Sequence, residues 1–135
     1  MKKILLAVTV FIVFSCNKEQ VALNKLDGEW NVTQMSTSET DYLILLEALG
    51  ITTLNYQFLD CDAGNTCDVY VKSEGTFLGF PVKDTDTLRY SLSDDASQLF
   101  IDDQQFDINN LTKSELEITG IDSTGLVIDI YMQKL

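Results

Sequence analysis

Histidine is absent from the 135-residue chain, and this absence excludes several kinds of active site. Without an imidazole base the chain cannot form a serine–histidine or cysteine–histidine pair, and it has neither a Gly-x-Ser-x-Gly elbow nor a phosphate-binding glycine loop. The cysteines also lack the Cys-x-x-Cys spacing of redox and zinc sites. The sequence therefore predicts a protein that is not an enzyme and that holds no cofactor and no metal.

Basic side chains are scarce. Nine Lys and Arg residues stand against 21 Asp and Glu residues, which gives a net charge of −12. Such a charge repels nucleic acid and anionic membrane faces, so neither is an expected partner of the protein surface. Carboxylate pairs such as Asp94 with Asp95 fall in expected turns, where both groups are solvated and neither resembles the desolvated acid of a glycosidase. The hydrophobic content of 45% predicts one folded domain.

The longest apolar run lies at the N-terminus. Lys2 and Lys3 precede apolar residues 4–14, and Ser15 stands directly before Cys16. A bilayer-spanning helix needs about 20 residues, so this run is too short to remain in the membrane. The pattern predicts a lipoprotein signal peptide over residues 1–15, an acylated Cys16 and a tether over residues 16–25; the alternative is an ordinary cleaved signal with a free cysteine. The expected location is the cell envelope, as an outer-membrane lipoprotein on the periplasmic face or the cell surface, held by its lipid.

The two remaining cysteines, Cys61 and Cys67, are predicted to form a disulfide. An exported chain meets an oxidising compartment, and the Gly64-Asn65 turn signal lies between the two residues. Oxygen ligands for calcium are a second interpretation of the same loop, but their spacing misses the EF-hand pattern, so a solvated turn is favoured. These candidate ligands are Asp60, Asp62, Asn65 and Asp68.

Apolar and polar side chains alternate in eight short segments, which is typical of strands with one buried face. The apolar positions are Trp30 and Val32; Leu54, Tyr56 and Phe58; Val69 and Val71; Leu88, Tyr90 and Leu92; Leu99 and Ile101; Phe106 and Ile108; Leu116 and Ile118; and Leu126, Ile128, Ile130 and Met132. No helix-length segment separates the later strands, so parallel crossovers are excluded for most of the chain. We therefore expect an all-β, eight-stranded antiparallel up-and-down barrel over residues 26–135, because closure removes exposed strand edges.

Two segments interrupt this alternation. Residues 39–49 are predicted to form a short helix after the first strand, with Ser38 as its cap, Asp41 at the capping-box position and Gly50 at its end. Apolar side chains cover nearly its whole circumference, so we expect a plug across one barrel mouth, or else a lid or docking surface. Residues 77–82 form the second apolar stretch, and Gly79 and Pro81 favour a loop or an edge that could line an entrance.

The sequence resembles the lipocalin-like domains of many Bacteroidetes lipoproteins, which belong to the wider calycin and lipocalin group. The resemblance covers residues 26–135 and depends on the opening Gly28-Glu29-Trp30, on the strand around Tyr90, and on the late segment 110–118. It implies that Trp30 fills the narrow end of the barrel, after a turn that Gly28 permits. In true lipocalins a basic side chain from the last strand covers this tryptophan, and the last strand here offers only Lys134.

Two noncatalytic functions follow as hypotheses. The first is binding of a small apolar or amphipathic ligand inside the barrel, an interior wide enough for one such molecule. The candidate ligand-binding residues are the large inward side chains Trp30, Tyr56, Phe58, Tyr90 and Phe106. These rings could equally fill the barrel, and the alternative is then an accessory module that contacts an envelope protein or a glycan. Its candidate contacts are Tyr42, Phe77, Phe80 and Tyr131.

Overall fold

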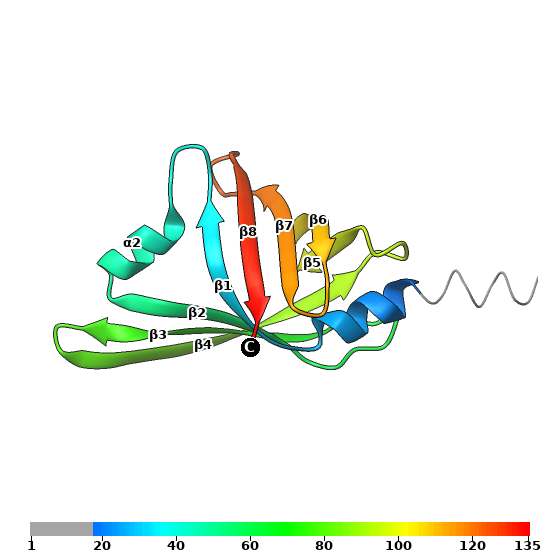
Figure 1. Ribbon diagram of the computed structural model, residues 1–135, viewed down its shortest axis with the longest axis horizontal. Helices are drawn as coiled ribbons and strands as arrows, with labels where there is room; N and C mark the ends of the chain where they lie inside the picture. The colour runs from blue at the N-terminus through cyan, green and yellow to red at the C-terminus, as the bar shows by residue number, and fades with distance from the viewer. Residues whose placement is uncertain (1–17) are drawn as a thin grey trace, which may run out of the picture.

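The computed structural model describes residues 18–135, so the predicted signal peptide and Cys16 lie outside the described residues. Eight antiparallel strands form a closed barrel in chain order, with β1 paired to both β2 and β8 (Figure 1). The fold predicted from the alternation is confirmed. The elements are β1 (Gly28–Ser36), α2 (Tyr42–Ala48), β2 (Ile51–Phe58), β3 (Cys67–Phe77), β4 (Phe80–Leu92), β5 (Gln98–Ile101), β6 (Gln104–Leu111), β7 (Glu115–Ile121) and β8 (Val127–Lys134).

Pairing between the strands brings the predicted inward residues onto one face. Trp30 pairs with Tyr56 across β1 and β2, and Ile118 pairs with Ile130 across β7 and β8. Trp30 and Ile118 are fully buried, which is the expected result when period-two alternation turns one face of every strand to the core.

The β3–β4 hairpin projects beyond the barrel wall. β4 pairs with β5 only from Tyr90 to Leu92, whereas its pairing with β3 continues to Phe80. Residues 77–82, predicted as a loop or an edge, thus form the end of a paired hairpin in which β4 has a free edge. Pro81 is tolerated there because the free edge of β4 has no neighbouring strand that needs its missing N–H. In Figure 1 this hairpin extends to one side of the barrel, below α2.

Residues 18–26 form a helix, which we call the N-terminal helix, on the opposite side of the barrel from the hairpin (Figure 1). This differs from the predicted tether over residues 16–25. Ala22, Leu23 and Leu26 share one face of the helix and are 7%, 1% and 0% exposed, because they pack into the narrow end of the barrel. The folded part of the chain therefore includes residues 18–25.

The helix after the first strand is shorter than predicted. α2 begins at Tyr42, and Asp41, not Ser38, caps it by accepting hydrogen bonds from the backbone N–H groups of Leu43 and Ile44. Gly50 follows its end with φ +86, as predicted for a glycine that terminates a helix. Across residues 18–135, no helix has both the length and the apolar character needed to cross a membrane.

Candidate functional site

Trp30 closes the narrow end of the barrel. Its indole Nε1 donates a 2.8 Å hydrogen bond to the carbonyl oxygen of Leu26, the last residue of the N-terminal helix. Lys134 from β8 lies with its Nζ 5.1 Å from the Trp30 ring centroid and donates a 2.7 Å hydrogen bond to the carbonyl oxygen of Lys25. Gly28 has φ +125 just before this tryptophan, so a side chain there would be strained. The basic side chain that the resemblance placed over the tryptophan is thus Lys134.

Three of the predicted ligand-binding rings fill the interior above this end. Tyr56 stacks on Phe58 at a centroid distance of 6.3 Å, and Phe58 meets Tyr90 edge to face at 5.0 Å. The Tyr90 hydroxyl donates to the carbonyl oxygen of Leu59, and burial, with smaller contributions from nearby carboxylates, raises the pKa of Tyr90 to about 12. Phe58 and Tyr90 are buried against one another, so this half of the barrel is packed with side chains.

Phe106 lies apart from those rings. It pairs with Leu99 across β5 and β6, and its ring occupies the space beside Gly120 of β7, where a Cβ on that glycine would lie only 2.6 Å from the ring. The structure therefore brings Trp30, Tyr56, Phe58 and Tyr90 together near the narrow end and places Phe106 on another part of the wall. Among these four residues, Tyr56 is the one that is not fully buried.

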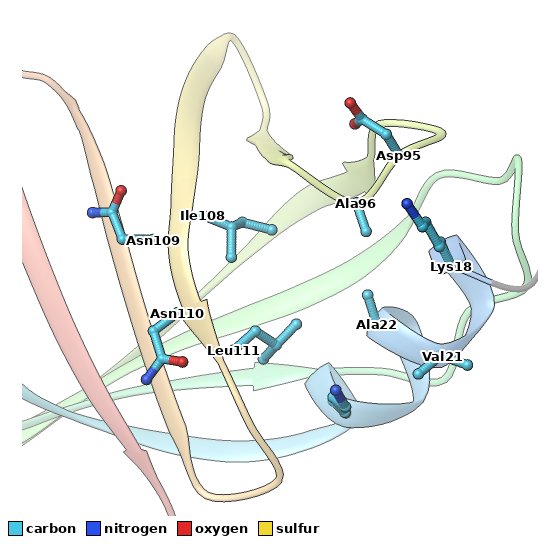
Figure 2. A pocket seen from close by; sticks show the side chains of 10 residues that line it. Lys18, Val21, Ala22, Asp95, Ala96, Ile108, Asn109, Asn110 and Leu111 are labelled. Carbon is cyan, nitrogen blue, oxygen red and sulfur yellow. The ribbon is translucent and has the colours of Figure 1, made fainter.

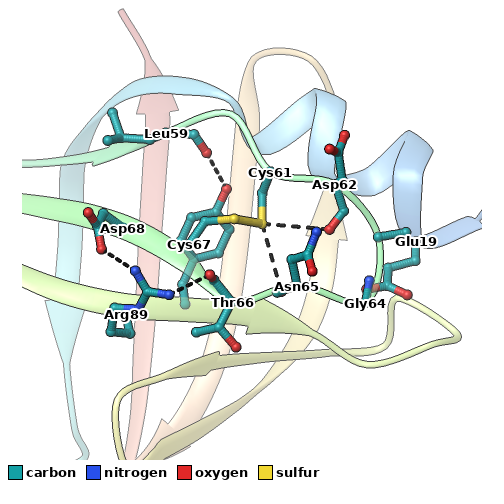
Figure 3. Close-up of a disulfide and its surroundings, with 12 residues drawn as sticks. Glu19, Leu59, Cys61, Asp62, Gly64, Asn65, Thr66, Cys67, Asp68 and Arg89 are labelled. Carbon is teal, nitrogen blue, oxygen red and sulfur yellow. Dashed lines mark hydrogen bonds and ion pairs between the residues drawn. A yellow bond between two sulfur atoms is a disulfide. The ribbon is translucent and has the colours of Figure 1, made fainter.

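The disulfide joins Cys61 to Cys67, whose Cα atoms are 5.8 Å apart (Figure 3). Its loop holds the N-terminal helix in place: the Glu19 Oε1 atom accepts a 2.8 Å hydrogen bond from the backbone N–H of Gly64, and Gln20 accepts from Ala63 at 2.9 Å. This clamp could not be predicted from the sequence, because nothing in a polar segment or in a distant loop indicates that the two meet.

One of the candidate calcium ligands around this loop, Asp68, is paired with Arg89. Arg89 donates to the Asp68 Oδ1 atom and to the carbonyl oxygen of Thr66, both at 2.6 Å (Figure 3). Within residues 18–135, no three acidic or cysteine side chains are grouped closely enough to hold a metal ion. The loop therefore serves here as a support for the N-terminal helix and β4.

The open mouth of the barrel lies between β1 and β2. These strands pair only from Gly28 to Asn31, and beyond that point they separate. α2 lies across the resulting wedge and forms one wall of a partly open pocket of about 230 Å³. Val32 and Leu54 line it from the barrel wall, and Leu43 and Leu46 line it from the helix. The Tyr56 side chain lies one inward position deeper than Leu54 on β2.

Comparison with known proteins identifies the fold. No protein-family model and no curated protein matches the sequence. Japanin from Rhipicephalus appendiculatus, solved with bound cholesterol, superposes with a TM-score of 0.56 at 8% identity, covering 78% of this chain and 74% of japanin. The siderocalin Ex-FABP superposes with a TM-score of 0.53 at 9% identity, covering 82% of this chain and 74% of its own. The chain has a lipocalin-like fold. Identities this low establish the architecture of the barrel alone.

A side-chain contact ties α2 to the loop between β7 and β8 of this lipocalin-like barrel. The Tyr42 hydroxyl donates a 2.8 Å hydrogen bond to the Asp122 Oδ2 atom in the β7–β8 loop. Hydrogen bonds from Thr124 and Tyr42 lower the pKa of Asp122 to about 2. No residue of α2 is buried, so the helix is not the tightly packed plug that its apolar composition predicted. Tyr42 and Leu43 hold the start of the helix, through the bond to Asp122 and through packing against the core.

The carboxylates of the lipocalin-like barrel behave as turn residues. Hydroxyl hydrogen bonds from Ser97 and Ser93 lower the pKa of Asp95 to about 2 in the β4–β5 turn. A carboxyl group with a lowered pKa remains ionised at neutral pH and is unsuited to donate a proton. This environment agrees with the prediction that Asp94 and Asp95 occupy a solvated turn.

The apolar residues of the hairpin tip, Phe77, Leu78 and Phe80, are exposed by 50%, 83% and 74%. Tyr42 and Tyr131, the other two candidate contacts, are less exposed: Tyr42 is hydrogen-bonded to Asp122, and Tyr131 is half-buried. Two of the four candidate contact residues, Phe77 and Phe80, thus lie together on the projecting hairpin.

Proposed function

We propose that the protein is a noncatalytic binding protein that holds a small apolar or amphipathic molecule in the mouth of its barrel, beneath α2. The observation that carries this proposal is the mouth pocket, where apolar side chains of the wall and of α2 face the same space. Ligand pockets usually measure about 300 to 1,000 Å³. A volume of about 230 Å³ therefore favours a small ligand, or a larger one that lifts α2.

Glu47, Thr52 and Thr53 also line the pocket and supply its polar groups. One inward position deeper than Leu54 lies Tyr56. Within residues 18–135 its hydroxyl has no side-chain partner, and burial alone raises its pKa, so it remains a neutral donor at physiological pH. The cholesterol held by japanin shows that a barrel of this architecture can take an apolar ligand, although it does not name the ligand here.

The test is organic extraction of the purified full-length protein, followed by mass spectrometry of the extract. We expect a bound small molecule in the wild-type protein and a strong reduction in Leu43→Asn, because Leu43 faces the pocket. Leu45→Asn is the matched control on the same helix, since Leu45 is 50% exposed. An empty wild-type extract, or equal loss in both variants, would contradict the proposal.

A second candidate function is that of an accessory module, favoured by the exposed tip residues Phe77, Leu78 and Phe80. Exposed aromatic residues on a projecting element are typical contacts for a protein or glycan partner. Leu78→Asp should then abolish crosslinking to an envelope partner without lowering stability. Unchanged crosslinking would remove this candidate.

We further propose that the protein is attached to the outer membrane through a lipid on Cys16, facing the periplasm or the cell surface. The support is the signal pattern of residues 1–16 together with the start of the folded part by residue 18. Mass spectrometry of the N-terminal peptide should find a diacylglyceryl cysteine. Release of Cys16→Ser into the soluble fraction would support the anchor, whereas an unmodified Cys16 in the wild-type protein would refute it.

A further inference from the structure

A second cavity lies between the N-terminal helix and the end of β6 (Figure 2). It is an open groove of about 720 Å³, about three times the volume of the mouth pocket. Its wall on the helix side consists of Lys18, Val21, Ala22 and Lys25, and its opposite wall includes Ile108 and Leu111. The groove therefore combines an apolar floor with two lysines.

The groove exists because β5 is too short to cover β6. β5 pairs with β6 only as far as Asp107, and one more hydrogen bond joins Ile108 to Ser97. Residues 109–111 continue along β7 alone, so their other edge faces the N-terminal helix instead of a strand. Figure 2 shows Leu111 directed toward Ala22 across this gap.

The orientation of the N-terminal helix is fixed. Glu19 and Gln20 bond the disulfide loop, and Leu23 is buried in the barrel end. The remaining face carries Lys18, Val21, Ala22 and Lys25, which recur at helical spacing. With a rise of about 1.5 Å per residue, the two lysines lie about 10 Å apart along the helix, one on each side of the apolar pair.

The two lysines of the groove have no carboxylate partner among the described residues. Three basic side chains of the strands form ion pairs: Lys72 with Glu29, Lys83 with Glu74 and Arg89 with Asp68. Among the ion pairs within residues 18–135, none involves Lys18 or Lys25. Asp95 also lines the groove, but its Oδ1 atom accepts hydrogen bonds from Ser93 and Ser97 of its own turn. Two cations without carboxylate partners in this part of the chain thus flank one apolar groove.

We propose that this groove binds a single-chain anionic amphiphile, with the acyl chain against Val21, Ile108 and Leu111 and the anionic head at Lys18 or Lys25. Electrostatic complementarity selects the sign of the head group, and the apolar floor selects a chain. A polyanion such as nucleic acid is excluded, because the rest of the surface repels it. The site is separate from the mouth pocket, so it stands independently of the function proposed above.

The test is an NMR titration of the ¹⁵N-labelled full-length protein with dodecanoate, dodecyl phosphate and dodecanol in detergent-free buffer. We expect dodecanoate to shift the amide signals of residues 18–25 and 108–111 and to leave residues 43–54 unchanged. Dodecanol should bind about tenfold more weakly, because it lacks the charge that the lysines attract. Preference for dodecanoate over dodecyl phosphate would indicate a free fatty acid as the source, and the reverse preference would indicate a lipid phosphate.

Charge variants complete the experiment. Lys18→Gln with Lys25→Gln should weaken dodecanoate binding about tenfold, because the head group then has no cation at either end of the groove. Lys83→Gln is the control, since it removes one lysine charge on the distant hairpin. Equal binding of dodecanol and dodecanoate, shifts confined to the mouth pocket, or no effect of the double variant would overturn the proposal.

Discussion

Removal of the Lys134 ammonium group should destabilise the narrow end of the barrel. Lys134→Met keeps much of the apolar stem of the side chain but removes both the 2.7 Å hydrogen bond to Lys25 and the contact with the Trp30 ring. A hydrogen bond from a charged donor contributes about 1.5 to 3 kcal/mol, and a partly exposed cation–π contact contributes about 0.5 to 1 kcal/mol. Lys134 is only half-buried, so the lower ends of these ranges apply. We expect a loss of about 2 kcal/mol in the free energy of unfolding.

The assay is urea unfolding followed by tryptophan fluorescence. Trp30 is the only tryptophan of the chain, so the emission reports on this end of the barrel and nowhere else. For a domain of this size, a loss of about 2 kcal/mol lowers the urea midpoint by roughly 1 M. Lys134→Arg should retain most of the stability, because a guanidinium can also lie over the ring.

Lys113→Met serves as the control, because Lys113 is an exposed turn residue. The reasoning would be refuted if Lys134→Met lost less than about 0.5 kcal/mol or behaved like this control. The narrow end would then depend on the buried indole and its bond to Leu26 alone.

The disulfide, α2 and the β3–β4 hairpin each give one further prediction. Replacing Cys61 and Cys67 by serine removes the cross-link of a short loop, which should lower the free energy of unfolding by about 2 kcal/mol in a urea titration. Equal urea midpoints for the variant and the oxidised wild type would contradict this prediction. Tyr42→Phe should raise the pKa of Asp122 from about 2 toward its ordinary value in an NMR titration, and it should speed amide exchange in α2. Because the pKa of Asp122 is lowered in the folded state, its contribution to stability is present above the ordinary pKa and disappears as the pH falls toward 2. Gly75→Ala would place a Cβ 1.8 Å from the backbone oxygen of Gly50, so it should lower the free energy of unfolding by about 2 to 3 kcal/mol in the same urea assay. Gly79→Ala, at an open turn position, should lower it less, because only the positive φ of Gly79 opposes the change.

The barrel could be predicted because alternation is a local signal. Each inward pair, such as Leu54 with Tyr56 or Val69 with Val71, specifies the buried face of its own strand without reference to any other. Eight such segments with short reversals leave few topologies, and the structure has the simplest of them. The disulfide could be predicted for the same reason, since Cys61 and Cys67 flank a turn that local sequence indicates.

The N-terminal helix was not predicted because its burial depends on distant residues. Leu23 and Leu26 have helical spacing, which is a usable signal, but the neighbouring Glu19 and Gln20 made the composition of the segment polar. Both side chains accept hydrogen bonds from the disulfide loop, more than 40 residues away. The cap of α2 shifted from Ser38 to Asp41 for a related reason, because pairing of β1 with β8 continues to Ser36 and delays the start of the helix.

The candidate sites could not be predicted from inward residues alone, because alternation gives the face of a strand and not its depth in the barrel. Phe58 and Tyr56 face the same way, yet Phe58 is fully buried and Tyr56 is partly exposed. Depth follows from where each strand loses its neighbour. β1 separates from β2 after Asn31, which opens the mouth pocket, and β6 continues past β5 after Asp107, which opens the groove beside the N-terminal helix. Both cavities therefore occur where the hydrogen-bonded wall ends and a helix covers the gap incompletely. The two proposed binding sites thus depend on unequal strand lengths more than on the rings that line the centre of the barrel.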